Sequence, residues 1–214
     1  MATRRARSDE DKLARRAEIL DAARQVFDGG EIDAFTMDDV AAALELAKGT
    51  LYRYFPTRES LLLALADDEY QQWFERVDEA LIASDLNASH VGAFAQLLVD
   101  QTLSQPRFLR LAALVPSVLE RNVPYETARE YKCNVVQRGR QTAALLAQRL
   151  GVSEHRATQL LIHLQAAATG LHHAANPAPI IVQVMADPLF PGRRTDLRTE
   201  LLHSARALVW AASL

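Results

Sequence analysis

The sequence lacks most features that mark secreted, membrane or redox proteins. It contains one cysteine, Cys133, which excludes an intrachain disulfide and the paired-cysteine spacings of zinc and redox sites. Its longest uninterrupted apolar runs have six residues, as in 61–66, whereas a membrane-spanning helix needs about 18. The N-terminus is basic and then acidic with no apolar stretch after it, so we expect no secretory signal and a soluble, cytoplasmic protein.

Positive charge is not in surplus either. The chain has 24 Lys and Arg against 27 Asp and Glu, a formal net charge of −3, whereas nucleic-acid-binding proteins usually carry a basic excess. The total hides an uneven distribution, because residues 1–16 and 46–58 each carry +3 and residues 59–85 carry −7. The low total therefore predicts modest non-specific affinity for DNA through a few phosphate contacts, and does not exclude DNA binding.

Motifs for catalysis are also missing from the sequence. It contains no GxGxxG or GxxxxGK[ST] loop, no HExxH pair and no GxSxG elbow. Cys133 has no evident base partner, and the acidic run at 67–69 would diverge around a helix axis rather than converge on a metal. We therefore expect no enzyme, no metal site and no cofactor.

Helix-forming residues dominate what is present, and strand-like alternation is nearly absent. Glycine and proline, at eight residues each, are too few for a collagen-like or low-complexity chain, and 49% hydrophobic content excludes wholesale disorder. Apolar residues recur at spacings of three and four, which predicts an all-α fold. The expected helices are 9–27, 36–44, 47–54, 58–84, 88–104, one from 106 that is kinked or broken at Pro116, 125–150, 153–175 and 195–212, with an irregular piece at 180–194.

The first three helices predict a helix-turn-helix. The first helix would bury a stripe, and Gly29 and Gly30 would end it. Its stripe consists of Leu13, Ala17, Leu20, Ala23 and Phe27, with Ile19 and Val26 beside it. Thr36 is a good N-cap for the second helix. By pattern alone, three ordinary packed helices remain the alternative.

The residues from Ala47 to Leu62, AKGTLYRYFPTRESLL, closely resemble the recognition-helix signature of the TetR (tetracycline-repressor) family. The likeness covers about 12–66. The sequence departs from the family pattern in having Glu45 where the turn usually has Gly, Ala47 where Ser is common, and Arg58 for the commoner Lys. The resemblance implies a helix-turn-helix DNA-binding domain at 12–66 and a helical ligand-binding and dimerisation domain at 67–214, after a flexible basic arm at 1–11.

Eight residues are candidates for contact with DNA. They are Thr36, Lys48, Gly49, Thr50, Tyr52, Arg53, Tyr54 and Arg58. Lysine and arginine reach phosphates and guanine edges, hydroxyls bond phosphates, and a glycine allows close approach of the backbone. Leu51 and Phe55 are assigned to the core. The arginines at 4, 5 and 7 form either a minor-groove arm or a solubilising tail.

Beyond residue 66, the candidates are for a small-molecule pocket and a dimer face. The pocket candidates are Trp73, Phe94, Phe108, Tyr125, Tyr131 and His163, with ordinary core packing as the alternative for each aromatic residue. The dimer-face candidates are Ala167, Gly170, Leu201 and Leu208, with burial inside one subunit as the alternative. His172 and His173 point about 100° apart on a helix and are expected at the surface.

Taken with the resemblance, the sequence predicts a homodimeric, sequence-specific regulator of transcription. It would bind a palindromic operator in double-stranded DNA as a repressor, and a small-molecule effector would release it. Two alternatives remain open: a transcriptional activator of the same family, and a non-enzymatic helical module for protein–protein interaction.

Overall fold

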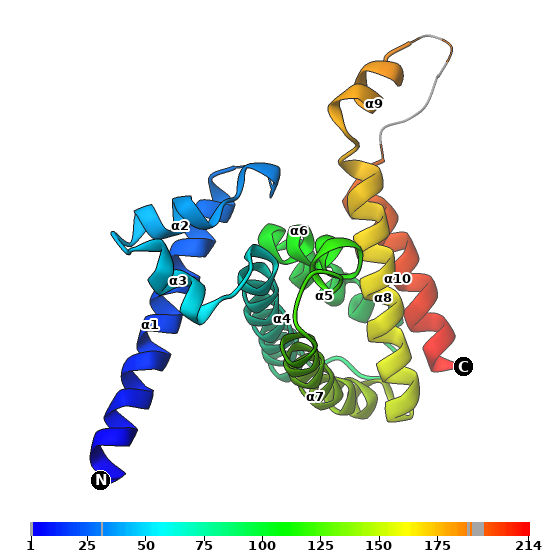
Figure 1. The fold of residues 1–214 in the computed structure, drawn as a ribbon. Helices are drawn as coiled ribbons and strands as arrows, with labels where there is room; N and C mark the ends of the chain where they lie inside the picture. Colours follow the sequence, from blue (N-terminus) through cyan, green and yellow to red (C-terminus); the bar gives the residue numbers. More distant parts are fainter. Residues whose placement is uncertain (1, 31, 188, 190–194) are drawn as a thin grey trace. The chain divides into compact units, whose positions relative to one another are not determined.

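The structure is a computed structural model that describes residues 2–30, 32–187, 189 and 195–214, with only the backbone described at 2–9 and 33. All regular structure in this part of the chain is helical (Figure 1), which confirms the all-α prediction. The helices are α1 (Ala2–Asp28), the short 3-10 helix η1 (Ile32–Ala34), α2 (Met37–Ala43), α3 (Lys48–Tyr54), α4 (Arg58–Ala83), α5 (Val91–Leu103), α6 (Pro106–Leu114), the π-helical turn η2 (Val115–Leu119), α7 (Tyr125–Leu150), α8 (Glu154–Ala175), α9 (Pro179–Val184) and α10 (Leu197–Ser213). None of the described helices is long and apolar enough to span a membrane.

The chain divides into two compact units. The first comprises the chain up to Asp68 together with Val115–Tyr131, and the second comprises Glu69–Leu114 with Lys132–Leu214. The passage between units inside α4 lies close to the domain boundary expected at 66/67. The assignment of Val115–Tyr131 to the first unit was not predicted, because nothing in that segment resembles the N-terminal helices.

The core of the first unit is built from the second half of α1 and the helices after it. Ile19, Ala23 and Phe27 of α1 are buried, as are Val40 of α2 and Leu51 of α3. The assignment of Leu51 and Phe55 to the core is confirmed, because their exposed fractions are 0% and 3%.

The predicted stripe of α1 is wrong in its first half. Leu13 is 68% exposed and Ala17 is also exposed, whereas the buried face begins at Ile19. The apolar spacing continues further toward the N-terminus than the packing does, because the first unit covers only the later turns of α1. The helix itself begins at Ala2, not near residue 9, so its backbone continues through the segment expected to be a flexible arm.

Capping residues fix several helix ends, among them the Thr36 cap predicted from the sequence. The hydroxyl of Thr36 accepts a hydrogen bond from the Asp39 N–H at 3.2 Å, and the hydroxyl of Ser153 accepts one from the Arg156 N–H at 3.3 Å. Asp196 caps α10 by accepting from the Thr199 N–H at 2.8 Å. Gly151 ends α7 with a φ of +68°, the left-handed conformation that glycine adopts without strain.

Two proline-containing segments differ from, or sharpen, the prediction. The piece at 180–194 was expected to be irregular, but Pro179 occupies the first turn of α9, where its missing N–H has no partner to lose. At Pro116 the helix turns to π geometry, with the Glu120 N–H donating to the Val115 carbonyl oxygen at 3.0 Å. Because proline provides no N–H, the regular ladder cannot continue there, as the expected break implied.

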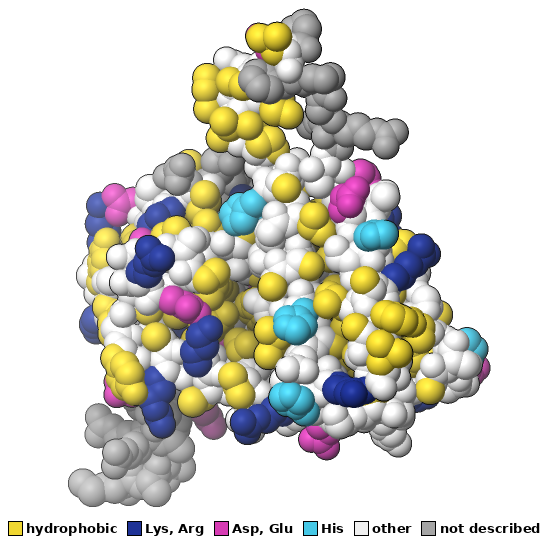
Figure 2. All heavy atoms as spheres, turned by 90° about the vertical axis from the view of Figure 1, so that its right-hand side faces the viewer, with side chains coloured by type: hydrophobic (Ala, Val, Ile, Leu, Met, Phe, Trp, Pro, Cys, Tyr) yellow, Lys and Arg dark blue, Asp and Glu magenta, His cyan; other side chains and the backbone are white. Residues whose placement is uncertain are grey.

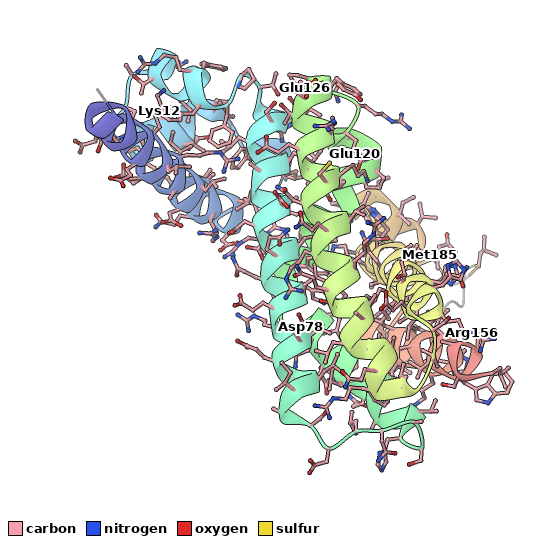
Figure 3. The ribbon with its side chains drawn as sticks, turned by 90° about the horizontal axis from the view of Figure 1, so that it is seen from below. Lys12, Asp78, Glu120, Glu126, Arg156 and Met185 are labelled. Atoms are coloured by element: carbon pink, nitrogen blue, oxygen red, sulfur yellow. The ribbon has the colours of Figure 1, made fainter. Side chains whose placement is uncertain are left out.

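The second unit packs aromatic and ionic groups between its helices. Trp73 of α4 stacks on Phe108 of α6 with centroids 5.3 Å apart, and its indole N–H donates to the Thr102 hydroxyl at 3.2 Å. Asp78, labelled on α4 in Figure 3, pairs with Arg138 of α7 at 2.8 Å. These contacts join α4 to α5, α6 and α7.

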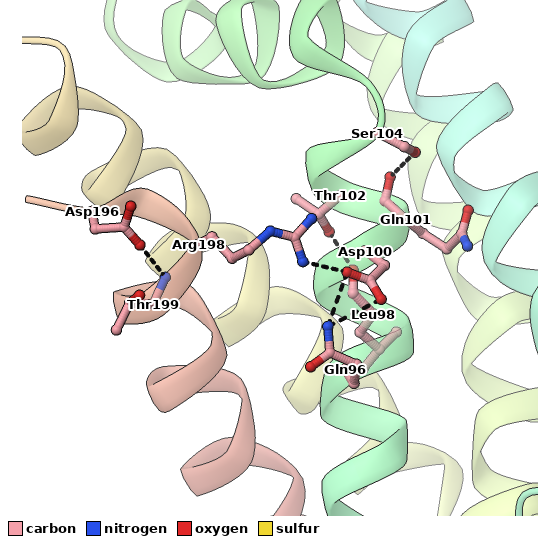
Figure 4. A network of polar contacts seen from close by, with 9 residues as sticks. All are labelled: Gln96, Leu98, Asp100, Gln101, Thr102, Ser104, Asp196, Arg198 and Thr199. Atoms are coloured by element: carbon pink, nitrogen blue, oxygen red, sulfur yellow. Dashed lines mark hydrogen bonds and ion pairs between the residues drawn. The ribbon is translucent and has the colours of Figure 1, made fainter.

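The contact of α10 with α5 adds a more exposed polar network (Figure 4). Arg198 at the start of α10 donates to Asp100 of α5 at 2.5 Å, and Gln96 donates to the same carboxylate at 3.0 Å. The bond from Arg198 lowers the pKa of Asp100 from its ordinary value. The pair is about half exposed, so its contribution to stability is small.

Candidate DNA-binding surface and ligand cavity

The turn between α2 and α3 closes with a non-glycine residue in the left-handed conformation. Glu45 has a φ of 52°, and its N–H donates to the Ala42 carbonyl at 3.1 Å. The Leu46 N–H donates to the Ala41 carbonyl at 2.9 Å. These two bonds form a Schellman cap, whose left-handed position favours glycine. The turn is therefore left-handed, and Glu45 holds that conformation with strain.

The short helix α3 buries one residue, and its other residues are half-buried or exposed. Leu51 is fully buried, whereas Lys48, Gly49 and Arg53 are exposed and Tyr52 is 46% exposed. Thr50 and Tyr54 are half-buried. At Gly49 an added Cβ would meet no atom within 4 Å, so packing within the described protein does not require the glycine. A close approach by an external partner would account for it.

Lys48 is the one predicted contact residue on α3 that already has an ionic partner in the described part of the chain. Its ammonium donates to the carboxylate of Asp38 in the first turn of α2, and both side chains are more than half exposed. The hydrogen bond to Asp38 raises the pKa of Lys48 above its ordinary value. Lys48 is thus held as a cation on the same surface as Arg53, with a carboxylate beside it.

Thr36 is occupied locally by its capping role. Its hydroxyl accepts from the Asp39 N–H and donates to the Asp39 carboxylate at 2.5 Å. This reciprocal arrangement fixes the start of α2. The side chain is exposed, at the same helix end as Asp38.

Arg58 was expected to be available to DNA, but its guanidinium already bonds backbone carbonyls of its own domain. Its Nε donates to the Phe35 carbonyl oxygen at 2.8 Å, and its Nη2 donates to the Ile32 carbonyl oxygen. Its guanidinium also lies over the Phe35 ring, 6.0 Å from the centroid, and 3.7 Å from Glu59. The arginine therefore ties the start of α4 to η1. The forked guanidinium bonds two carbonyls at once, which a lysine cannot do with the same geometry.

The side chains of the arginines at 4, 5 and 7 lie outside the described residues. Their predicted contact with the minor groove stays a prediction.

A cavity of about 260 Å³ lies in the second unit among α4, α7 and α8. Trp73, one of the predicted pocket residues, lines it together with its neighbour Phe74. The apolar lining is completed by Val135, Val136, Gly139, Leu161 and Ile162. Gly139 packs tightly here, because a Cβ at that position would lie 3.1 Å from the ring of Phe74.

The other pocket candidates are distributed differently. Phe94 and Phe108 are buried in the core of the second unit without lining this cavity. Tyr131 lines a smaller, polar cavity of about 150 Å³ in the first unit, beside Arg16 and Asp67.

Tyr125 and His163 line neither of these cavities. Tyr125 is 76% exposed at the start of α7, and His163 is exposed on α8. His163 has leucines as sequence neighbours, but the buried face of α8 runs through Leu160, Leu164 and Ala168, and His163 lies off that face.

The dimer-face candidates also differ in how exposed they are. Leu201 is fully buried within the second unit, where α10 packs on α5 and α8, so it is not available to a partner. Ala167 and Leu208 are half-buried, and Gly170 is exposed with open space beside it. The sequence could not separate Leu201 from Leu208, because the apolar residues of α10 surround most of the helix.

Exposed apolar side chains do occur on α8, α9 and α10. Ile162 is 58% and Trp210 is 59% exposed, and α9 buries none of its residues. Figure 2 shows hydrophobic side chains among histidines over α8 and α10, and a further group on α9. Within the described residues, no three His, Cys, Asp or Glu side chains are grouped so that they could hold a metal ion.

Comparison with protein-family models identifies both parts of the chain. Residues 19–65 match the model described as "Bacterial regulatory proteins, tetR family". Residues 67–210 match the model described as "Tetracyclin repressor-like, C-terminal domain". The second match alone covers more than half of the sequence.

Individual relatives match over shorter stretches. The HTH-type transcriptional repressor KstR of Mycolicibacterium smegmatis is 36% identical over 74 residues, which is 35% of this chain and 36% of that protein. KstR of Rhodococcus jostii is 42% identical over 71 residues, which is 33% of this chain and 32% of that protein. The chain thus aligns with about a third of the length of these curated relatives.

A solved structure shares the fold over nearly the full length. It is a TetR-family transcriptional regulator from Mesorhizobium loti, with a TM-score of 0.56 and 19% sequence identity, covering 94% of this chain and 96% of that one.

Proposed function

Because the chain belongs to the TetR family of bacterial transcriptional regulators, we propose that it acts as a dimeric repressor that binds a palindromic operator and is released by a small molecule. The proposal places its action on DNA in the cytoplasm, without catalysis. The observation that carries it is the exposed polar surface of α3. This helix follows a left-handed turn, and its buried residue belongs to the same core as those of α1 and α2.

The division of labour on that surface follows from side-chain chemistry. Arg53 is exposed and makes no ion pair within the described residues, so its fork is available to a guanine edge or a phosphate. Lys48 supplies a second cation, and the half-buried Thr50 and Tyr54 supply hydroxyls at the same helix. Arg58 acts in this proposal as a support of the domain rather than as a contact to DNA.

Dimerisation would give the operator its symmetry. Two copies of α3 that read one palindromic site must lie about one turn of DNA apart, which requires a two-fold interface. The exposed Ile162 and Trp210, with Gly170 and the half-buried Ala167 and Leu208, support α8 and α10 as that interface. Leu201 is excluded from it.

Release would use the cavity of the second unit. Gln165, which lines the cavity, donates a hydrogen bond to the hydroxyl of Tyr70 on α4. The same helix begins at Arg58, which bonds the carbonyls of η1. An effector that prefers one position of α4 over another would shift the equilibrium between a DNA-competent dimer and one with the wrong spacing.

The proposal is tested by gel-shift titrations at stated salt with DNA from upstream of the gene and its neighbours. We expect a sequence-selective shift, and a loss of about 1–3 kcal/mol in operator binding for Arg53→Ala if it reads a base. Lys48→Ala should weaken operator and unrelated DNA alike, because a phosphate contact carries no sequence information. The matched control is Arg76→Ala, an exposed arginine on α4 outside the proposed DNA-binding surface and dimer interface.

Absence of any selective shift would reject the regulator proposal. Sedimentation at micromolar concentration checks the dimer, and a monomer would contradict it. In-vitro transcription from a promoter that contains the bound site distinguishes a repressor from an activator. The amount of transcript falls when the protein is a repressor and rises when it is an activator.

A further inference from the structure

The cavity of the second unit has mostly apolar walls and a charged residue in its lining, which limits the chemical class of its ligand. Two aromatic side chains, Trp73 and Phe74, form part of its wall, and aliphatic side chains of α7 and α8 form much of the remainder. Its volume of about 260 Å³ is near the lower end of small-molecule sites, which occupy about 300–1,000 Å³. Such a wall favours an apolar body of modest size.

Among the described residues that line the cavity, Arg140 is the only charged one. It is exposed, and no carboxylate in the described part of the chain pairs with it. Two residues earlier on the same helix, Arg138 is paired with Asp78 at 2.8 Å and lies over the Phe74 ring at 5.8 Å. The positive charge of Arg138 is thus balanced inside the unit, whereas that of Arg140 is available at the edge of an apolar cavity.

The two other polar side chains of the lining each donate one hydrogen bond inside the unit. The hydroxyl of Thr158 donates to the Glu154 carbonyl oxygen at 2.8 Å. The amide of Gln165 donates to the hydroxyl of Tyr70. The charged group that a ligand meets among these residues is therefore a guanidinium, whose forked donors match a carboxylate.

We propose that this cavity binds a hydrophobic carboxylate, with the apolar body against Trp73 and Phe74 and the carboxylate paired with Arg140. The inference rests on the proposed function in making this carboxylate the effector. The binding step itself is independent of DNA and is measured without it.

The test uses the two tryptophans of the sequence. Trp73 lines the cavity and Trp210 is exposed on α10, so Trp210→Phe leaves Trp73 as the single tryptophan reporter. Operator binding is measured on the protein without this substitution, because Trp210 belongs to the proposed dimer interface. The full-length variant is titrated with decanoate, decan-1-ol and decylamine, which share one apolar chain and differ in the charge of the head group. All are kept below micelle formation at one ionic strength. We expect saturable changes in Trp73 emission, with decanoate bound at least about threefold more tightly than the alcohol or the amine, which is the scale of an ion pair at an exposed arginine.

Two substitutions in this background locate the site. Arg140→Gln should bring decanoate affinity down to that of decanol and leave decanol unchanged, whereas Arg129→Gln, at an exposed arginine on the same helix, should change neither. Val136→Phe enlarges a side chain at the cavity and should weaken both decanoate and decanol. Circular dichroism of each variant verifies its helical fold.

The outcomes separate the two proposals. Equal affinity for the three compounds, an unchanged decanoate affinity in Arg140→Gln, or no saturable response would overturn the carboxylate site. A protein that binds its operator yet fails this titration retains the proposed function without this ligand. A protein that binds decanoate but no operator loses the proposed function and keeps the site.

Discussion

At the scale of single residues, the turn of the DNA-binding unit holds a strained backbone. Glu45 occupies the left-handed position of a Schellman cap, where a side chain costs about 1–2 kcal/mol relative to glycine. A glycine at this position would relieve that strain but would lose more conformational freedom on folding, which costs about 0.5–1 kcal/mol. The remaining difference favours glycine at this position.

We therefore expect Glu45→Gly to raise the free energy of unfolding by about 0.5–1 kcal/mol, as the balance of these two terms. Urea denaturation at 25 °C measures the change. Glu45→Ala is the matched control, because it removes the charge and keeps the left-handed strain. Equal stabilisation by both variants would show that the carboxylate, and not the backbone, is the source.

Residue-level prediction from sequence succeeded where the signal was local and failed where it was distant. Thr36 was identifiable as a cap because it bonds an N–H three residues on, and Ser153 and Asp196 form the same local bond. The task of Arg58 could not be identified, since its carbonyl partners lie 23 and 26 residues earlier in the chain. A motif shows which residue type occurs at a position, but not which backbone groups will fold against it.

At the scale of elements, the C-terminal end of α8 contains a charge that folding disfavours. His172 is half-buried, and its pKa is lowered from 6.5 by burial, then by the neighbouring His173 and by Arg110. The folded state binds the proton of His172 less tightly than the unfolded chain does. The contribution of the neutral imidazole to stability is therefore fully present above the unfolded pKa and is lost as pH falls below about 6.5.

The free energy of unfolding should accordingly decrease between pH 7 and pH 5, and His172→Asn should make this decrease smaller. Denaturation series at three or more pH values measure both slopes. The control is His155→Asn at an exposed position of the same helix. An unchanged slope in His172→Asn, or an equal change in the control, would assign the pH dependence to other groups.

Element prediction was most successful for long amphipathic helices with a cap at one end. The expected range 125–150 coincides with α7, and α4 ends within one residue of its expected end. The short α9 was missed, because six apolar residues between prolines have no polar face that would reveal a helical period. Likewise, apolar spacing alone did not separate the packed turns of α1 from the exposed turns before Ile19.

At the scale of the whole molecule, the proposed regulation requires coupling between the cavity and the start of α4. The hydrogen bond from Gln165 to Tyr70 is a direct polar link between the cavity lining and that helix. Coupling between two sites commonly corresponds to a 5–150-fold change in affinity and is reciprocal. Loss of this link should therefore reduce the communication between sites more than it alters either site alone.

Tyr70→Phe removes the hydroxyl and preserves the buried ring that packs edge-to-face on Phe108. We expect operator affinity without ligand to stay within about twofold, and the ratio of operator affinities without and with ligand to fall at least about threefold. Gel shifts with and without saturating decanoate measure this ratio. Tyr125→Phe, at an exposed tyrosine, is the control. A coupling ratio that is unchanged in Tyr70→Phe would exclude the bond as part of the transmission.

The pair formed by Lys48 and Asp38 has a consequence for how such a regulator searches a chromosome. If Lys48 contacts DNA as proposed, each arbitrary phosphate must compete with the carboxylate already bonded to it, so random encounters would release fewer counterions. Residence on unrelated sequences would thereby be shortened. An operator that supplies further contacts from Arg53 and its neighbours outweighs the competition. Because a genome offers about 10⁶–10⁹ competing sites, a small handicap at each of them leaves more of a scarce protein free to find the correct one.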